Sequence, residues 1–367
     1  MFINSKGDYM KKELLLGTAL VSTLGAASVA EAVTHSFSGN HQTGLEFDSP
    51  TSGSDTRAQI NDNNFSISLS ETTDGGITIS SSFSIVNEST ASSSVGASDM
   101  DAGFTLEFTD GSKLDVINAG NASGTHDVSI PGSAGSEGVT VTTSNKAPTG
   151  LDFATGATVY GVEYHTADDF MADGLKMSAS WSTDDGGAAA STYGITGHYA
   201  IGATYVTDFG DTAVTIGAGY SQTDGNIANP NTPPTNDEGG MHIGVSAVNG
   251  DLTVAVGVAD GDDIAVSTGT TNDTELDAEV MKAGVKYVVD DLTFNVGVAS
   301  GTAKDNTTFG TAGTTEDSKD VTSASVSYAV ASGVTAILGY TDVDSSDEGV
   351  NDTTDGSAWY IGANMSF

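Results

Sequence analysis

The sequence predicts an all-β fold, a transmembrane antiparallel β-barrel of about sixteen strands. Many segments alternate apolar residues with small or polar ones, which is the pattern of a strand with one dry and one wet face. Short Gly/Asp turns join these segments in pairs, and longer acidic loops separate the pairs. Beyond the N-terminal leader, no stretch approaches the roughly 20 apolar residues of a membrane-spanning helix.

The composition agrees with a barrel better than with a large soluble core. Only 37% of the residues are hydrophobic, which suits strands that turn every second residue outward. A disordered chain is the alternative interpretation of so much Ser, Thr, Asp and Gly, but the regular alternation argues against it. The net charge of −38 disfavours nucleic acid as a partner, and the absence of cysteine excludes disulfides and thiolate metal sites.

The N-terminus has the pattern of an export signal, predicted to cover residues 1–32. A basic start at Met10-Lys11-Lys12 precedes an apolar run that ends before Ala30-Glu31-Ala32, a small-x-small cleavage site. Met10 is a possible true start, and Glu31 is an alternative first residue of the mature chain. A membrane anchor is disfavoured because the apolar run is short and interrupted by Gly and Ser. The barrel domain is therefore expected to cover residues 33–367.

Strand-like segments follow in order. The first five cover residues 35–47, 57–70, 77–85, 104–108 and 113–117. Asp-Gly turns, which tolerate positive φ, join the second segment to the third and the fourth to the fifth. The alternation then stops from Asn118 to Gly156, and a gap of this length in a compact domain usually has a function or is disordered.

Eleven further segments complete the pattern. They cover residues 159–165, 175–181, 193–206, 213–220, 241–248, 252–258, 280–288, 292–298, 321–330, 334–343 and 357–367. In the last one, Trp359, Ile361 and Phe367 share the apolar parity. Short turns on one side and long loops on the other favour an outer-membrane barrel over a sandwich. A barrel of this size leaves an aqueous channel.

Three features resemble the general diffusion porins of the Gram-negative outer membrane: the hairpin Phe65–Ile79, the strand Leu175–Trp181 after an Asp-Gly turn, and the terminal Phe367. The resemblance implies a homotrimer in the outer membrane, surrounded by its lipid. It also implies that the long third loop folds into the lumen as an eyelet, and that Phe367 is an assembly signal. The sequence departs from the family in having one arginine, Arg57, where such porins carry several on the eyelet wall.

Two sets of charged residues are candidates for the pore. Within the expected eyelet loop the ionisable residues are His126, Asp127, Glu137, Lys146 and Asp152. The expected pore-wall residues are Arg57, Lys113, Asp115, Lys176, Lys282 and Lys286. The lysines are out of phase with their apolar neighbours, and a lysine facing lipid costs about 2–4 kcal/mol at the midplane. Arg57 cannot be phased, because the alternation slips between Ile60 and Phe65. The alternative is that these charges only solvate the inner wall.

No cofactor or metal site is expected. The acidic segments Asp260-Gly261-Asp262-Asp263 and 342–347 offer oxygen ligands for calcium, but neither matches an EF-hand, and solvated loops are favoured. Motifs for nucleophilic, zinc or phosphate chemistry are absent from the sequence, so an enzyme is not expected.

The expected function is a water-filled channel for the passive diffusion of small hydrophilic solutes and ions, with a preference for cations because of the net charge. The alternative is a secreted, acidic, calcium-stabilised adhesin or surface-layer protein. That alternative shares the leader, the acidity and the lack of cysteine, but it does not need Phe367 or the alternation of short turns and long loops.

Overall fold

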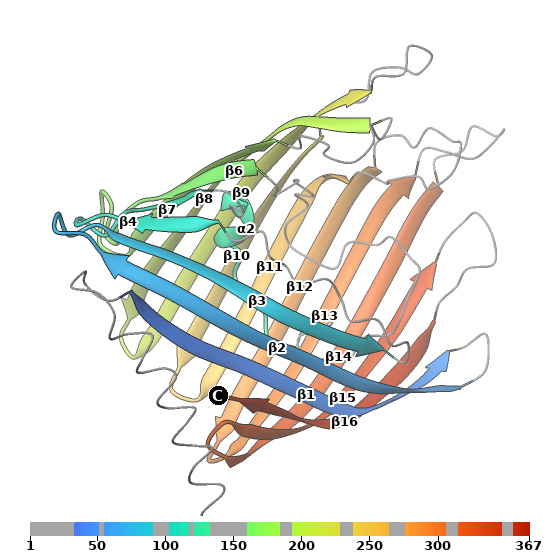
Figure 1. Cartoon of the computed structure of the whole chain (residues 1–367). Helices are drawn as coiled ribbons and strands as arrows, with labels where there is room; N and C mark the ends of the chain where they lie inside the picture. The colour runs from blue at the N-terminus through green and yellow to red at the C-terminus, as the bar shows by residue number, and fades with distance from the viewer. Residues whose placement is uncertain are drawn as a thin grey trace, which may run out of the picture.

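A computed structural model describes most of the barrel (Figure 1). The described residues are 33–50, 55–90, 103–116, 121–132, 160–183, 193–227, 238–263, 276–305, 315–346 and 355–367. The predicted leader, 1–32, lies outside these ranges. Within them, no helix is long and apolar enough to cross a membrane.

Sixteen strands form the wall of the described chain. The first eight are β1 (Thr34–Pro50), β2 (Thr56–Thr72), β3 (Thr78–Thr90), β4 (Phe104–Glu107), β5 (Lys113–Val116), β6 (Tyr160–His165), β7 (Leu175–Thr183) and β8 (Tyr193–Phe209). The others are β9 (Thr212–Ile227), β10 (Glu238–Asn249), β11 (Leu252–Asp263), β12 (Leu276–Val289), β13 (Leu292–Asp305), β14 (Thr315–Ala331), β15 (Val334–Ser346) and β16 (Gly356–Ser366). One short helix, α2 (Ala122–Thr125), interrupts this series.

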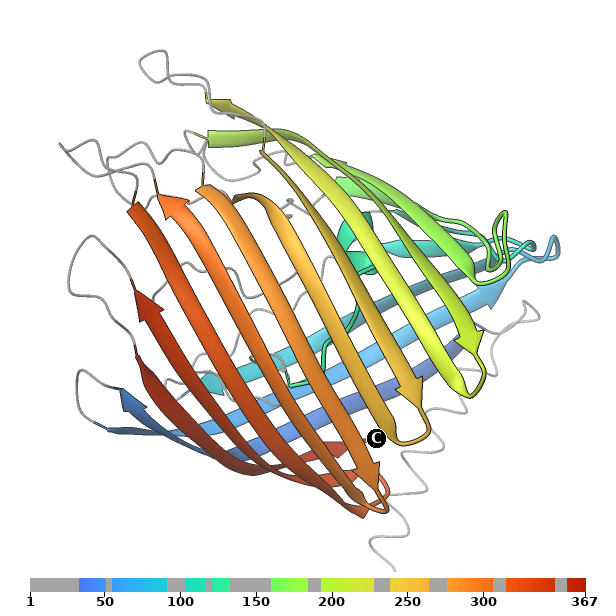
Figure 2. The ribbon, with the colours of Figure 1, turned by 180° about the vertical axis from the view of Figure 1, so that it is seen from behind.

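The strands close into an antiparallel barrel (Figures 1 and 2). Each strand pairs with its neighbours along the chain, and β1 completes the ring by pairing with both β2 and β16. A closed ring leaves no unpaired edge, which is the condition for strands to cross lipid. The predicted fold of about sixteen antiparallel strands is therefore confirmed.

Most strands extend beyond the segments that the alternation marks. β9 continues to Ile227 and β13 to Asp305, each several residues past the last regularly alternating apolar residue. The sequences of these extensions are mostly polar or small, and they lie at the end away from the short turns. A strand that rises above an apolar band meets water on both sides, so it loses the alternation that reveals it.

The apolar parity faces outward. In β8, Ile201 is 59% exposed, whereas His198 and Ala200 on the other parity are 2% and 3% exposed. The helix α2 lies inside the ring in both views, and it contacts the small and polar parity of this wall (Figures 1 and 2). Burying alternate residues against lipid and turning the others inward is what the period of two requires.

The apparent slip in β2 is not a change of register. β1 and β2 pair without interruption from Thr34–Ser70 to Asp48–Thr56. Ile60 lies on the inner parity, where it forms a buried apolar cluster with Ala358 and Tyr360. An apolar residue on the inner face thus produces the break in the sequence pattern.

Candidate functional site: the lumen wall and the segment on it

The candidate site is the inner face of β5 to β13 together with residues 121–132, which we call the lumen segment. The lumen segment begins with a cap, because the Asn121 side chain accepts a 3.0 Å hydrogen bond from the Ser123 amide. The amide of Ala122 donates to Ser180 Oγ of β7 at 3.0 Å. At the end of α2, Thr125 Oγ1 donates to Glu163 Oε1 of β6 at 2.7 Å. These bonds fasten the helix to two neighbouring strands.

His126 is held between two strand hydroxyls. Its Nδ1 lies 2.7 Å from Thr204 Oγ1 of β8, and its Nε2 lies 2.8 Å from Ser178 Oγ of β7. Hydroxyls can donate or accept, so both contacts can be satisfied by a neutral imidazole. Burial lowers the pKa of His126 to about 4, and the nearby His165, His242 and Lys176 contribute to the lowering. His126 is therefore neutral at physiological pH.

After His126 the lumen segment alternates like a strand. His126, Val128 and Ile130 are buried against the wall, whereas Asp127 and Ser129 are exposed toward the lumen. Ile130 packs in a buried cluster with wall residues of β11 and β12, namely Ala255, Ala259 and Val280. This burial holds the segment flat on the wall and turns the Asp127 carboxylate inward.

A row of glycines on the inner wall leaves room for the backbone of the lumen segment. The inward-facing members are Gly202, Gly217, Gly219, Gly244, Gly284 and Gly297. A Cβ atom at Gly202 would clash with the Ala122 carbonyl, and one at Gly284 would clash with the Pro131 carbonyl. Several are paired across strands, including Gly202 with Gly219 and Gly284 with Gly297. The missing side chains therefore form a shallow path that the backbone of the segment occupies.

Hydrogen bonds extend from His126 across the wall to an acidic residue. Ser178 Oγ also lies 2.9 Å from His165 Nδ1, and His165 Nε2 lies 2.8 Å from Asp115 Oδ2. Glu163, on the strand between, is only 1% exposed and accepts the Thr125 hydrogen bond. The predicted pore-wall residue Asp115 thus belongs to a network that anchors the lumen segment.

Asp127 lies beside two basic groups. Its Oδ1 is 3.9 Å from His242 Nδ1 of β10. Lys282 of β12, which is 8% exposed, interacts electrostatically with the same carboxylate. His242 Nε2 in turn lies 2.9 Å from the Ser123 carbonyl. The structure thus brings together two predicted site residues, Asp127 and Lys282, with a histidine that the sequence did not single out.

The other predicted wall lysines also lie on the inner parity. Lys113 Nζ is 3.3 Å from Glu107 Oε2, and Lys176 Nζ is 2.8 Å from Asp168 Oδ1. Both pairs are about half exposed or more and lie next to short turns, so they stabilise the fold little. Lys286 is exposed on the same parity of β12 as Lys282. Three of the four wall lysines are therefore close to a carboxylate.

Arg57 was expected on the pore wall, and the structure places it on the outer face instead. Arg57 is the register partner of Phe47, whose other partner is Trp359. Its guanidinium lies 5.9 Å from the centre of the Phe47 ring. The side chain is therefore part of an outward aromatic group, where a cation over a ring face is favourable.

Three predicted constriction residues, Glu137, Lys146 and Asp152, lie outside the described residues. Phe367 is described: its ring points outward and lies 6.4 Å from the Phe65 ring, centre to centre. In the described part of the chain, no group of three or more His, Cys, Asp or Glu side chains could hold a metal ion.

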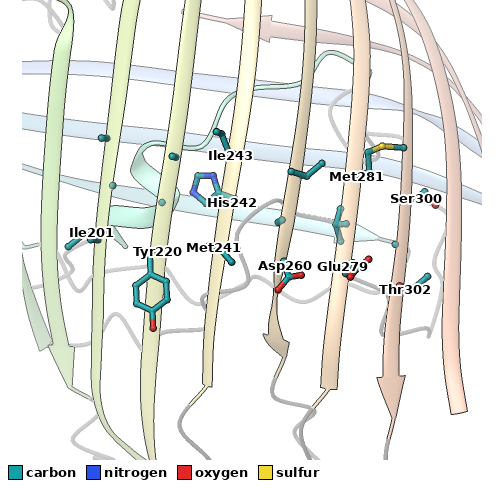
Figure 3. Close-up of a pocket in the computed structure, with 18 of the residues that line it drawn as sticks. Ile201, Tyr220, Met241, His242, Ile243, Asp260, Glu279, Met281, Ser300 and Thr302 are labelled. Atoms are coloured by element: carbon teal, nitrogen blue, oxygen red, sulfur yellow. The ribbon is translucent and has the colours of Figure 1, made fainter. Parts of the chain in front are cut away.

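An apolar groove of about 870 Å³ lies on the outside of the wall formed by β7 to β13 (Figure 3). Its apolar lining includes Ile201, Met241, Ile243, Val258 and Met281. Asp260, from the first of the two acidic segments considered as calcium ligands, and its register partner Glu279 also line the groove. These residues share the outward parity, so the groove faces away from the pore.

Several residues that hold the lumen segment were not predicted. They are Thr125, Val128, Ile130, Glu163, His165, Ser178 and His242. The alternation of His126, Val128 and Ile130 is a signal that could have located the seated part. No local signal identifies the partners on the wall, since they lie on other strands.

A closed sixteen-stranded barrel with an apolar outside and a small or polar inside has the architecture of an outer-membrane channel. Residues 17–348 match the Gram-negative porin family. The chain therefore belongs to the Gram-negative porins, which are channels of the outer membrane and not enzymes. No curated protein matches the chain.

Solved porins share the fold at low sequence identity. A porin refined at 1.8 Å resolution is 19% identical, with a TM-score of 0.61 over 91% of this chain and 100% of that chain. OmpT of Vibrio cholerae, in its trimer form, is 14% identical, with a TM-score of 0.60 over 92% and 100%. An anion-selective porin from Comamonas acidovorans is 10% identical, with a TM-score of 0.61 over 91% and 100%.

Proposed function

We propose that this porin prefers cations among the small hydrophilic solutes and ions that pass it. The observation that carries the proposal is the charge of the wall: Lys113 and Lys176 each lie next to a carboxylate, and Lys282 lies near Asp127. Arg57, the one arginine of the chain, lies on the outer face of the barrel, so the pore wall gains no arginine charge to balance its acidic residues. The net charge of −38 is unchanged by removal of residues 1–32, which hold three charges of each sign. A pore of one predominant sign concentrates counter-ions.

We infer that the loop 118–156 forms the constriction. The seat of residues 121–132 supports this proposal, because it fixes the first part of the loop on the inner wall and directs Asp127 toward the lumen. Glu137, Lys146 and Asp152 are proposed to contribute charges from the rest of the loop. Asp127 is the described residue best placed to act on a passing ion.

We also propose a homotrimer in outer-membrane lipid. OmpT of Vibrio cholerae, which shares the fold of this chain, has a solved trimer form, and this supports the proposal. Chemical cross-linking of the detergent-extracted protein would test it, because a trimer gives a limiting species of three chains. If only single chains are seen at every cross-linker concentration, the proposal is contradicted.

Reversal potentials across a planar bilayer under a potassium chloride gradient test the cation preference. The preference should be clear at low salt and weaken as salt rises, because the Debye length falls to about 8 Å at physiological ionic strength. Lys282→Gln should strengthen the preference, since it removes a positive charge beside Asp127. Arg57→Gln is the matched control: it removes the same charge from the outer face and should leave the reversal potential unchanged. A wild-type pore that is anion-selective or unselective at low salt would refute the proposal.

A further inference from the structure

His242 has a buried ring nitrogen that points at a carboxylate. The imidazole is inaccessible to solvent, and its Nε2 lies 2.9 Å from the Ser123 carbonyl. A carbonyl only accepts, so Nε2 carries the proton of the neutral ring, and Nδ1 presents a lone pair. Nδ1 has no hydrogen-bond partner among the described residues, and the nearest carboxylate oxygen is Asp127 Oδ1 at 3.9 Å. A lone pair that faces a carboxylate is an arrangement that a proton on Nδ1 would convert into an ion pair.

We propose that His242 is a selectivity-determining residue: it takes up a proton at Nδ1 as the pH falls, binds Asp127 and lowers the cation preference of the pore. The inference rests on the proposed cation preference, and it assigns the control of that preference to one histidine. The proton comes from the water of the lumen, Nε2 keeps its hydrogen bond to Ser123, and the Asp127 carboxylate stays ionised. An imidazole is suited to this role because a protonated ring donates from both nitrogens, so it can hold the Ser123 carbonyl and the Asp127 carboxylate at the same time.

The surroundings of His242 leave few competing charges. On the lumen segment the titratable neighbours are Asp127 and His126, and on β12 the neighbour is Lys282. The strands on either side of β10 contribute Gly219 and Ala259 at this level, which carry no charge. His126 has a pKa of about 4 and so remains neutral through the relevant range. Protonation of His242 therefore changes the net charge of Asp127, Lys282 and His242 from zero to +1.

The expected effect is measurable. Asp127 is 34% exposed, so ions can approach the carboxylate that His242 would neutralise. One charge placed about 6 Å from an ion in a water-like medium changes the local ion concentration by about threefold. The same charge depletes potassium and enriches chloride, so the ratio of potassium to chloride permeability should fall by up to about tenfold between pH 8 and pH 5, beyond the change caused by other acids.

The test compares His242→Gln with the wild type at pH 8 and pH 5 in a planar bilayer. The glutamine amide can keep the donation to Ser123 but cannot gain a charge. This variant should lack the change in the permeability ratio of about tenfold, since all other titrating groups are common to both proteins. His35→Gln is the matched control, because His35 lies against Phe37 on the outer parity of β1. It should retain the full response of the wild type.

The outcomes separate this inference from the proposed function. A wild type without cation preference at pH 8 refutes the proposed function, but a pH response that His242→Gln removes would still support the role of His242. A cation-preferring wild type whose pH response equals that of His242→Gln overturns the inference. If His242→Gln does not insert, Asp127→Asn takes its place. Without the carboxylate His242 has no ion-pair partner, so that variant should also lose most of the response, and an undiminished response would overturn the inference.

Discussion

Phe367 and Gly39 exchange two backbone hydrogen bonds, each 3.1 Å long. These bonds continue the ladder between β1 and β16 by one pair beyond the register that ends at Asn40 and Ser366. The Phe367 ring covers Gly39, where a Cβ atom would lie 2.7 Å from the ring carbon Cζ. The last residue therefore takes part in closing the barrel, and its aromatic side chain is exposed on the outer face.

Deletion of Phe367 should lower the amount of folded protein in the outer membrane. The deletion removes two hydrogen bonds at the seam and an outward aromatic side chain at the end of the barrel. The measurement is the fraction of heat-modifiable protein in outer-membrane preparations. Phe209→Ala is the matched control, because Phe209 is another exposed aromatic at the end of a strand but takes no part in the seam. Insertion equal to the wild type would show that Phe367 is incidental.

Gly284→Ala should displace the lumen segment and lower the single-channel conductance. The new methyl group would occupy the space of the Pro131 carbonyl, so the segment must move toward the pore axis. Overpacking of this kind costs about 1–3 kcal/mol. Gly75→Ala serves as the control, since a Cβ atom there meets only Thr73 Oγ1 at 3.8 Å. A conductance that is the same in Gly284→Ala and the wild type would mean that the segment does not narrow the pore.

Acidification should loosen the lumen segment through His126. The seated residue has a pKa of about 4, below the ordinary value of 6.5, so the detached form binds more protons between these pH values. The free energy that holds the lumen segment on the wall is therefore unaffected above about pH 6.5. It weakens as the pH falls toward 4, by no more than about 3 kcal/mol.

Cysteine labelling can follow this change, because the chain has no native cysteine. Val128 faces the wall and Ser129 faces the lumen, so the labelling rate of Val128→Cys relative to Ser129→Cys reports detachment. The ratio should rise as the pH falls from 6.5 to 4, and adding His126→Gln should flatten the rise. A ratio that stays constant over this range would contradict the prediction.

The barrel was predictable because its signal is local. Trp359, Ile361 and Phe367 mark an outward face by sequence position alone, and the same period recurs in each pair of strands. The phase of the first part of β2, from Arg57 to Ile60, was not predictable in this way. Ile60 reads as a break in the pattern, and its place beside Tyr360 depends on how the two ends of the chain meet at the seam.

The sequence by itself determined the strand count and the outward parity of most strands, because period-two alternation and turn chemistry involve neighbours along the chain. The family was indicated by a resemblance in the hairpins and in the terminal Phe367. Only the tertiary structure decided the seat of residues 121–132, the outward position of Arg57 and the approach of His242 to Asp127. These depend on contacts between residues far apart in sequence. Such contacts are set by barrel closure and by the register between strands, which no single segment encodes.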